Sequence, residues 1–434
     1  MAKSHRLPGR AALPHNAAVL RFAGVSMLSG QVGRFPLLAP LRGRDFALLW
    51  SGNAISLAGD QFQAVALAVM TLDLTGSTAV LGAVLGVQAV PRALLMLLGG
   101  VAADRYRPRT VMLAANALEG VLVTLLAADI WAGRLAIWHL YVYGVCSGAV
   151  LAFSVPAATT FVPFVVPQEH RRSANALNSL NVNLASAVYP PLAGVLVAAL
   201  GSLPAFALNA ASFFAAAGLV RGIRVLGTPT RSGASALHQL REGLVAARSE
   251  RVVWVAIVAG AIYSLGSGGA TLVGVPALGK LSLQAGSEGV GFLFGAVGAG
   301  AVVGTIITGS LAGMRRQGLV AGATLTGCGV ALALVAAAPT LREAVPLMAM
   351  AGLLRGAMAN IYVTLVQSRA PEAARGRVIA LFMLGVFGLS PLSFGIGGAV
   401  GAVVGPRALL ALGGGCVALA GVYSLAHRAF READ

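Results

Sequence analysis

The fold is decided by a pattern that is clearest in residues 104–131, DRYRPRTVMLAANALEGVLVTLLAADIW. A cluster of charged residues is followed by a long apolar run, with Glu119 near its middle and Asp129 near its end. The run is close to the length of about 20 apolar residues that a helix needs to cross the hydrocarbon core of a bilayer. This segment therefore predicts one membrane-spanning helix that carries an ionisable group near its middle.

The same alternation of charged clusters and apolar runs extends over most of the chain. Of the 434 residues, 57% are hydrophobic and 10% are charged, and the mean hydropathy is +0.83. We predict an all-α membrane protein with twelve transmembrane helices in two six-helix halves. The expected spans are 46–72, 78–103, 109–131, 136–160, 174–200, 203–222, 252–279, 285–312, 318–338, 344–368, 378–403 and 406–428.

The basic residues predict the orientation, because Lys and Arg accumulate in the cytoplasmic loops of membrane proteins. With these spans, 25 of the 31 basic residues fall on the side that holds both termini, and 4 fall on the other side. The remaining two, Arg92 and Arg355, lie inside spans. We expect the chain to lie in the cytoplasmic membrane, with both termini in the cytoplasm. The net charge of +17 follows from this topology, so we expect no nucleic-acid partner.

The polar stretches divide the chain into five parts. We expect a basic, disordered N-terminal tail at 1–44, a six-helix half at 45–222 and a cytoplasmic linker at 223–250. A second six-helix half at 251–428 and a short tail at 429–434 follow. Residues 237–244 of the linker suit a surface helix. Two blocks of six spans around a linker are the layout of transporters that bind substrate near the membrane midplane.

Five stretches resemble a known family. Residues 100–109, GVAADRYRPR, resemble the loop signature between the second and third helices of the major facilitator superfamily. Four others are similar to the branch that includes macrolide-efflux and enterobactin-export proteins: FALLWSGN from Phe46, SANAL from Ser173, PAFALNAASF from Pro204 and QSRAPEAARGRV from Gln367. The resemblance covers about residues 44–428. Proton-coupled drug exporters often carry Gly-Pro followed by a further Gly in the fifth span. Here Pro190, Pro191 and Gly194 match that motif in part.

Three charged residues lie near the middle of spans in the first half: Asp60, Arg92 and Glu119. A charge at this depth is costly, so each should face a cavity, pair with an opposite charge or, for a carboxyl, take up a proton. Asp60 is a candidate proton-coupling or substrate-cation site, or else a structural partner of Arg92. Glu119 is a candidate for the same cavity role or for a structural hydrogen bond.

The two arginines inside the spans keep their charge and need partners. Arg92 is interpreted as a fixed counter-ion of Asp60 or Glu119. Arg355, in the tenth span, has no acidic partner at its depth in the second half. It is therefore a candidate contact for an anionic or carbonyl-rich substrate, with snorkelling or bonds to carbonyl groups as the alternatives.

The resemblance also implies a gate at the cytoplasmic ends of the helices. Gly100, Asp104, Arg105 and Arg109 belong to the loop signature, and Arg377 is a candidate partner for Asp104. Small residues at four-residue spacing, such as Gly82/Gly86, Gly291/Gly295 and Gly300/Gly304, predict close helix packing.

Motifs of soluble enzymes are missing from the sequence. A near match to a phosphate-binding loop ends at Lys280, but Leu281 stands where Ser or Thr is required. Cys146, Cys328 and Cys416 lie in apolar runs and are expected to be packing residues. We therefore expect no metal, no cofactor and no enzymatic activity.

These observations and the resemblance predict a secondary active transporter that works as a monomer. Its expected substrate is a small, partly hydrophobic compound, such as a drug, a siderophore or a secondary metabolite. Export by proton antiport and alternating access is the main hypothesis. Uptake or facilitated diffusion of a metabolite is the alternative, and a membrane enzyme or a non-transporting sensor is a third possibility.

Overall fold

The computed structural model describes residues 36–227, 236–310 and 315–434, and all regular secondary structure in them is helical. Most of the expected N-terminal tail, residues 1–35, therefore lies outside the described residues. The last part of that tail is ordered and forms a short 3-10 helix, η1 (Pro36–Arg42). Leu41 of η1 packs against an apolar cluster that contains Phe46 and Leu177.

The first six spans are long helices joined by short turns. They are α2 (Arg44–Thr75), α3 (Thr78–Arg105), α4 (Pro108–Trp131), α5 (Ile137–Val165), α6 (Arg171–Leu200) and α7 (Leu203–Arg221), with η2 (Gln168–His170) before α6. The turn between α2 and α3 shows why the breaks fall where they do. Gly76 ends α2 with a φ of +60°, a conformation that glycine adopts without strain. Ser77 then caps α3 by accepting a hydrogen bond from the backbone N–H of Val80.

The second half begins with a helix that changes its winding. It comprises α9 (Arg251–Gly269), η3 (Ala270–Gly274), α10 (Val275–Ala277) and η4 (Leu278–Ser282). Both η3 and η4 are π-helical turns, which are wider than an α-helix and are often found at functional sites. The next three spans are α11 (Gly286–Ser310), α12 (Gln317–Val335) and α13 (Leu341–Arg369).

The last two spans lie within one long helical segment. Among the described residues, eleven helical segments are long and apolar enough to cross a membrane, and the last of them, Arg375–Ala426, has 52 residues. It contains α14 (Arg375–Phe387) and α15 (Ser390–Ala426), after the 3-10 turn η5 (Glu372–Ala374) and before α16 (Arg428–Arg431). Gly405, with a φ of +82°, kinks α15, and Pro406 restarts the helix. The segment therefore makes two passages, and the prediction of twelve spans is confirmed.

The eleventh span, expected at 378–403, is interrupted within its length. The helix breaks after Phe387, where the backbone N–H of Gly388 bonds the carbonyl of Leu384. Pro391 lies in the first turn of α15, and a proline has no N–H to continue the preceding helix.

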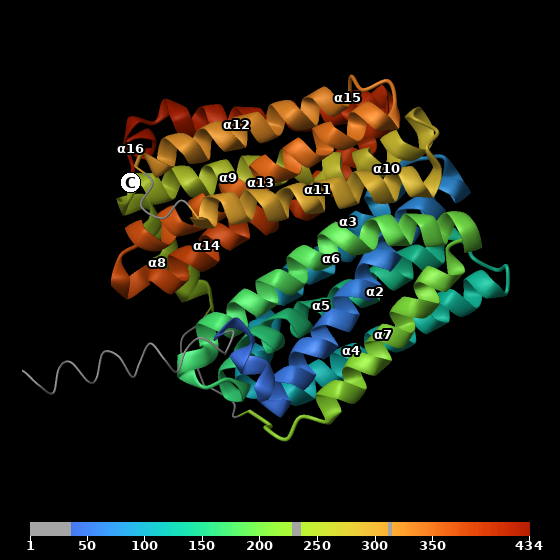
Figure 1. Ribbon diagram of the computed structural model, residues 1–434, viewed down its shortest axis with the longest axis horizontal. Coiled ribbons are helices and arrows are strands. Elements are labelled where there is room, and N and C mark those ends of the chain that lie inside the picture. Colours follow the sequence, from blue (N-terminus) through green and yellow to red (C-terminus); the bar gives the residue numbers. More distant parts are fainter. Residues whose placement is uncertain (1–35, 228–235, 311–314) are drawn as a thin grey trace, which may run out of the picture.

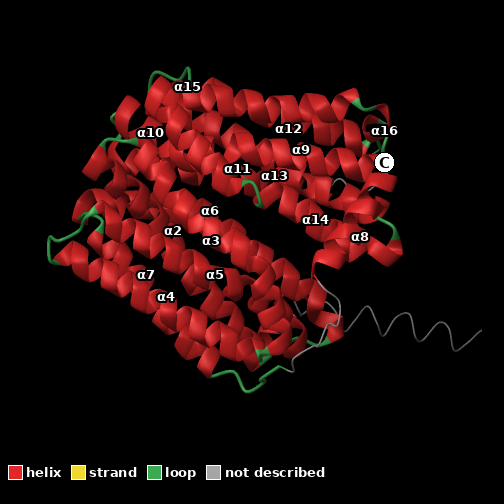
Figure 2. Cartoon of the chain, turned by 180° about the vertical axis from the view of Figure 1, so that it is seen from behind, coloured by secondary structure: helices red, strands yellow, loops and turns green. Residues whose placement is uncertain are grey.

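The helices form two groups, which we call the first bundle (α2–α7) and the second bundle (α9–α15). Figure 1 shows the first bundle in blue and green and the second in yellow and red. Within the first bundle, α2 packs on α6 and α7, while α5 packs on α3 and α4. Within the second, α13 packs on α11 and α12, while α15 packs on α9 and α12. The bundles meet where α6 lies along α11 (Figure 2). They also meet where α3 lies along α15.

The two ends of the molecule differ. The linker end carries the helix α8 (Ala236–Ser249), which confirms the expected surface helix, together with the start of α14 and the C-terminus (Figure 1). α8 packs on α9 and α14, so it belongs with the second bundle. The opposite end carries the turn between α2 and α3, and we call it the closed end because the bundles are joined there.

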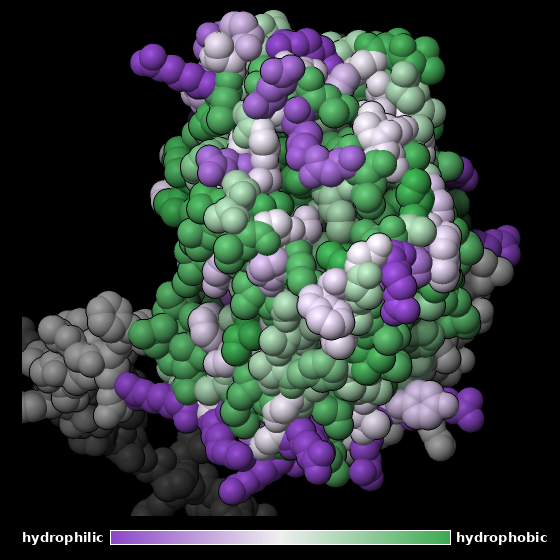
Figure 3. All heavy atoms as spheres, turned by 90° about the vertical axis from the view of Figure 1, so that its right-hand side faces the viewer, coloured by the Kyte–Doolittle hydropathy of each residue, from purple (hydrophilic) through white to green (hydrophobic). Residues whose placement is uncertain are grey.

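Apolar side chains from both bundles pack together toward the closed end. Ala68, Leu72 and Leu81 of the first bundle form one cluster with Val273, Ala277 and Leu409 of the second. Beside this cluster, the Lys280 Nζ atom lies 2.5 Å from the Asp73 Oδ1 atom and joins the two bundles. The hydroxyl of Thr78 also donates a hydrogen bond to the carbonyl of Gly398. Figure 3 looks onto this end and shows a largely apolar face with scattered hydrophilic residues.

Glycines allow the backbones of the two bundles to touch. A Cβ atom at Gly82 would lie 2.5 Å from the carbonyl oxygen of Phe394 and 2.6 Å from the Cα atom of Gly398. A Cβ atom at Gly194 would lie 2.6 Å from the carbonyl oxygen of Ser287. Both distances are too short for a real side chain. The predicted close packing of helices at small residues is therefore confirmed at these contacts.

Candidate functional site

Polar side chains gather in the apolar interior of the first bundle. They come from four helices that would otherwise pack through hydrophobic residues: α2, α4, α5 and α7. Those that the structure buries are Gln63, Glu119, Tyr143, Ser147, Asn209 and Ser212. Buried polar groups need hydrogen-bond partners, so their arrangement can be followed bond by bond.

The first part of this network joins α2 to α7. Asp60 and Gln63 lie one turn apart on α2, and Gly59 beside them lets α2 approach α7 closely. A side chain at Gly59 would overlap with the side chains of Asn209 and Ser212. The glycine thus brings the polar groups of the two helices within hydrogen-bonding distance.

The bonds of this part form a chain. The hydroxyl of Ser212 donates to Asn209 Oδ1 at 2.9 Å, and Asn209 Nδ2 donates to Gln63 Oε1 at 2.7 Å. Gln63 Nε2 in turn donates to the hydroxyl of Tyr143 on α5. Asp60 Oδ1 lies at the side of the chain, 3.5 Å from Asn209 Nδ2. Asp60 is half-buried, so it connects the network to the more accessible surface of α2.

The second part of the network ends on Glu119. Ser147 lies one turn after Tyr143 on α5, and its hydroxyl donates to Glu119 Oε1 at 3.1 Å. Gln88 of α3 donates to the same serine oxygen at 3.2 Å. Glu119 is 2% exposed, and its second oxygen has no hydrogen-bond partner among the described residues. An ionised carboxylate there would carry charge on an unpaired, buried oxygen, which is strongly unfavourable.

Arg92 is less enclosed than the two carboxyl groups. Its side chain is exposed in the structure, and it interacts electrostatically with Asp60. No oxygen of Asp60 lies within ion-pair distance of it, although both residues belong to the described part of the chain. The expected role of Arg92 as a fixed counter-ion therefore stays a prediction.

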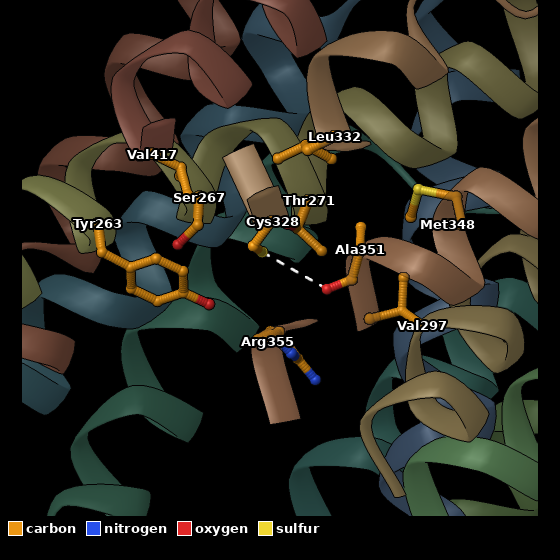
Figure 4. Close-up of a pocket in the computed structure, with 10 residues that line it drawn as sticks. All are labelled: Tyr263, Ser267, Thr271, Val297, Cys328, Leu332, Met348, Ala351, Arg355 and Val417. Carbon is orange, nitrogen blue, oxygen red and sulfur yellow. Dashed lines mark hydrogen bonds between the residues drawn. The ribbon is translucent and has the colours of Figure 1, made fainter. Parts of the chain in front are cut away.

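Arg355 lies in the second bundle, at the middle of α13. It lines a small pocket together with Tyr263 and Ser267 of α9 and Cys328 of α12 (Figure 4). The thiol of Cys328 donates a weak hydrogen bond to the carbonyl of Ala351 at 3.5 Å. The structure therefore separates the candidate residues into two sites: Asp60, Arg92 and Glu119 in one bundle, and Arg355 in the other.

The residues of the expected gate lie at the linker end. Gly100 and Asp104 belong to α3, but their side chains fall outside the described residues. Arg105 is exposed. Arg109 has a defined contact, because its guanidinium donates to the carbonyls of Val220 and Arg221 at the end of α7, at 3.2 and 2.5 Å. A cation at this position suits the partial negative charge of a helix C-terminus.

Arg377 has a different partner from the one expected. Its Nη1 atom lies 2.6 Å from Glu242 Oε2 on α8. Gly243 lets α8 lie close to this point, because a Cβ atom there would be 3.0 Å from the carbonyl of Arg377. The predicted contact between Arg377 and Asp104 thus stays a prediction, while the contact with the linker helix is observed.

Sequence reasoning missed most of the neutral members of the network. Gln63, Gln88 and Ser147 are single polar residues in apolar runs, and charge alone drew attention to Asp60 and Glu119. A usable signal exists in the spacing, since Gln63 follows Asp60 by one helical turn. Tyr143 is one of the seven tyrosines of the chain, and the bond between its hydroxyl and Gln63 makes it a member of the network.

The family of transmembrane secretion effectors matches residues 36–433. The chain belongs to this family of the major facilitator superfamily. Enterobactin exporters EntS from Shigella boydii and Escherichia coli are 26% identical over 380 residues, which cover 88% of this chain and 91% of theirs.

Solved structures of transporters share the fold at low sequence identity. A bacterial homologue of the iron transporter ferroportin in an inward-facing state has a TM-score of 0.70 at 17% identity, covering 88% of this chain and 98% of that one. A bacterial homologue of the lysosomal transporter Spinster, inward-facing and unoccupied, has a TM-score of 0.62 at 15% identity, covering 89% and 96%. The twelve-helix architecture of this secretion effector is therefore that of the superfamily.

Proposed function

We propose that this protein exports a small, partly hydrophobic compound across the cytoplasmic membrane in exchange for protons. The observation that carries the proposal is the buried network that ends on Glu119. Among the described acidic residues, only Asp60 and Glu119 lie at the middle of a spanning helix. Acidic groups at mid-depth in a membrane typically mark ion or proton pathways.

The network gives each carboxyl group a distinct part in proton exchange. Asp60 is half-buried and can meet water, while Glu119 is enclosed and holds a single hydrogen bond. A proton on Glu119 removes the unfavourable buried charge, and Asp60 provides the accessible group from which it arrives or to which it leaves. The neutral side chains between them, Gln63 and Tyr143, fix the relative positions of α2 and α5 around this path.

Alternating access follows from the contacts between the bundles. The apolar cluster and the pair of Asp73 and Lys280 join the bundles toward the closed end, so this conformation is proposed to admit substrate from the linker end. The excess of basic residues at the linker end supports placing that end, and both termini, in the cytoplasm. A single chain holds both bundles, which supports a monomer as the working unit.

The enterobactin exporters among the relatives support export. Uptake is the second candidate function.

A test begins with the protein expressed in an efflux-deficient bacterial host and a resistance screen over antibiotics, dyes and siderophores. For any compound that is extruded, we expect an uncoupler to reduce extrusion to the level of cells without the protein. Unchanged extrusion after the proton gradient has collapsed would remove proton exchange from the proposal.

Variants then test the carboxyl groups. We expect Glu119→Gln and Asp60→Asn to abolish proton-driven extrusion while the protein still reaches the membrane. Glu343→Gln is the matched control, because Glu343 is exposed in the first turn of α13. Purified protein in liposomes distinguishes the alternatives: accumulation in the opposite direction indicates uptake, and no movement of any compound indicates an enzyme or a sensor.

A further inference from the structure

The second bundle contains a pocket that the proton-exchange network does not use. It lies among α9, η3, α11, α12, α13 and α15, near the middle of each span, and has a volume of about 20 Å³. That is room for roughly one water molecule, so it can hold a single chemical group and not a whole compound. Its lining residues are Tyr263, Ser267, Thr271, Val297, Cys328, Leu332, Met348, Ala351, Arg355 and Val417.

Every polar side chain of this lining can donate a hydrogen bond, and Arg355 is the one that carries a charge. Tyr263 has Arg355 and Ser267 as the polar neighbours of its hydroxyl. In Figure 4 that hydroxyl points toward the side of the pocket where Arg355 lies, and the guanidinium of Arg355 points away from Cys328. Tyr263, Ser267, Thr271 and Arg355 all retain some exposed surface. These four side chains are therefore not sealed within the core of the bundle.

Arg355 lacks a counter-charge within its own bundle. Among the described residues of the second bundle, it is the only charged residue at the middle of a spanning helix, and no carboxylate lies within ion-pair distance of it. A guanidinium cannot lose its charge to relieve burial. An anion from outside the protein is the partner that this position lacks, and guanidinium bonds carboxylates in a two-pronged geometry.

We propose that Arg355 binds an acidic group of the exported compound, with Tyr263 and Ser267 as further donors. The substrate class is thus an organic acid whose anionic group is a carboxylate or a similar oxyanion. The pocket takes only that group, so the rest of the compound lies outside it. This inference rests on the proposed export function and assigns the substrate to one bundle and the proton to the other.

Export of an anion changes the net charge that each transport cycle moves across the membrane. An anion that leaves the cell while one proton enters moves two elementary charges in the same direction. The membrane potential, negative inside, then drives the cycle together with the proton gradient. A neutral substrate would move only one charge per proton.

The test uses pairs of probes that differ only in charge: aromatic carboxylic acids and their primary amides, such as 1-naphthoic acid and 1-naphthamide. Extrusion is measured from efflux-deficient cells, and transport currents are measured with purified protein on supported membranes. We expect the wild type to prefer the acids, and we expect Arg355→Gln to reduce that preference about tenfold or more. Arg355→Lys should restore part of it, because the charge is kept and the two-pronged geometry is lost.

Arg342→Gln is the matched control, since Arg342 is exposed near the start of the same helix. It should keep both the preference and the current. Tyr263→Phe removes one hydroxyl only, and a reduced preference in this variant supports the site even if Arg355→Gln does not fold. A wild type that prefers the amides, or an Arg355→Gln variant that keeps the preference for acids, overturns the inference while proton-driven export stands. If neither probe is extruded, the inference is overturned, and the proposed function falls only if the resistance screen also finds no extruded compound.

Discussion

The contact between α3 and α15 near the closed end allows a sharp test of how the bundles are held together. In Gly82→Ala, the new methyl group would lie 2.5 Å from the carbonyl oxygen of Phe394 and 2.6 Å from the Cα atom of Gly398. Ordinary contacts of this kind are about 3.5 Å or more, so α3 and α15 must separate by roughly 1 Å. Overpacking of this kind costs about 1–3 kcal/mol, which corresponds to a shift of about 5- to 150-fold away from this conformation.

Gly86→Ala is the matched control. It lies one turn further along α3, and its Cβ atom would be 3.8 Å from the carbonyl of Pro391, an ordinary contact. Both substitutions remove a glycine from the interior of the same helix, so their effects on helix propensity cancel in the comparison.

The assay follows opening of the closed end through Leu72, which is 2% exposed and part of the apolar cluster there. In a background with the three native cysteines replaced by serine, the thiol of Leu72→Cys should react with a water-soluble maleimide faster in Gly82→Ala than in Gly86→Ala. Size-exclusion chromatography confirms that both variants are folded. Equal labelling rates in the two variants would refute the reasoning, because backbone contact at Gly82 would then not hold the bundles together.

Three further predictions concern single contacts. Asp73→Lys or Lys280→Asp should each favour opening of the closed end, and the double exchange should restore the wild-type labelling rate of the Leu72→Cys reporter. The ion pair stabilises the closed end by only about 1 kcal/mol or less, because Asp73 is 53% exposed. Arg109→Ala should lower the thermal stability by about 1–3 kcal/mol, measured by thermal unfolding in detergent, because it leaves two carbonyls of α7 without a charged donor. Gly405→Ala should destabilise the fold by about 1–2 kcal/mol or more, since its φ of +82° strains any residue with a Cβ atom; unchanged melting temperatures would contradict both stability predictions.

The fold was largely readable from the sequence because one physical requirement dominates it. Each span must be about 20 apolar residues long, and the charges must lie outside the hydrocarbon core, so the limits of α3, α4 and α7 follow closely from composition. Hydropathy alone does not locate the break in the eleventh span. Gly388 and Leu389 are as compatible with an apolar helix as their neighbours, and hydropathy does not register a turn inside a run.

The candidate site was only partly readable. Charge at mid-depth identified Asp60, Glu119 and Arg355 as unusual, because burial of a charge is costly whatever the surroundings. Their partners depend on which helices touch. The proximity of Gln63 to Asn209, across 146 residues of sequence, follows from the close approach of α2 and α7 at Gly59. No local pattern in one sequence specifies such an approach, and the same holds for the contact of Arg377 with Glu242.

The two π-helical turns give the first helix of the second bundle an unusual mechanical property. η3 contains Thr271, which lines the pocket beside Arg355, and η4 contains Lys280, which holds Asp73. A π-turn accommodates one extra residue, and its return to α-helical winding advances the following residues by about 100° around the helix axis. A change in winding at η3 would therefore rotate Lys280 about the helix axis, away from Asp73, and break this ion pair. The same helix would then couple ligand binding beside Arg355 to the contact between the bundles at the closed end.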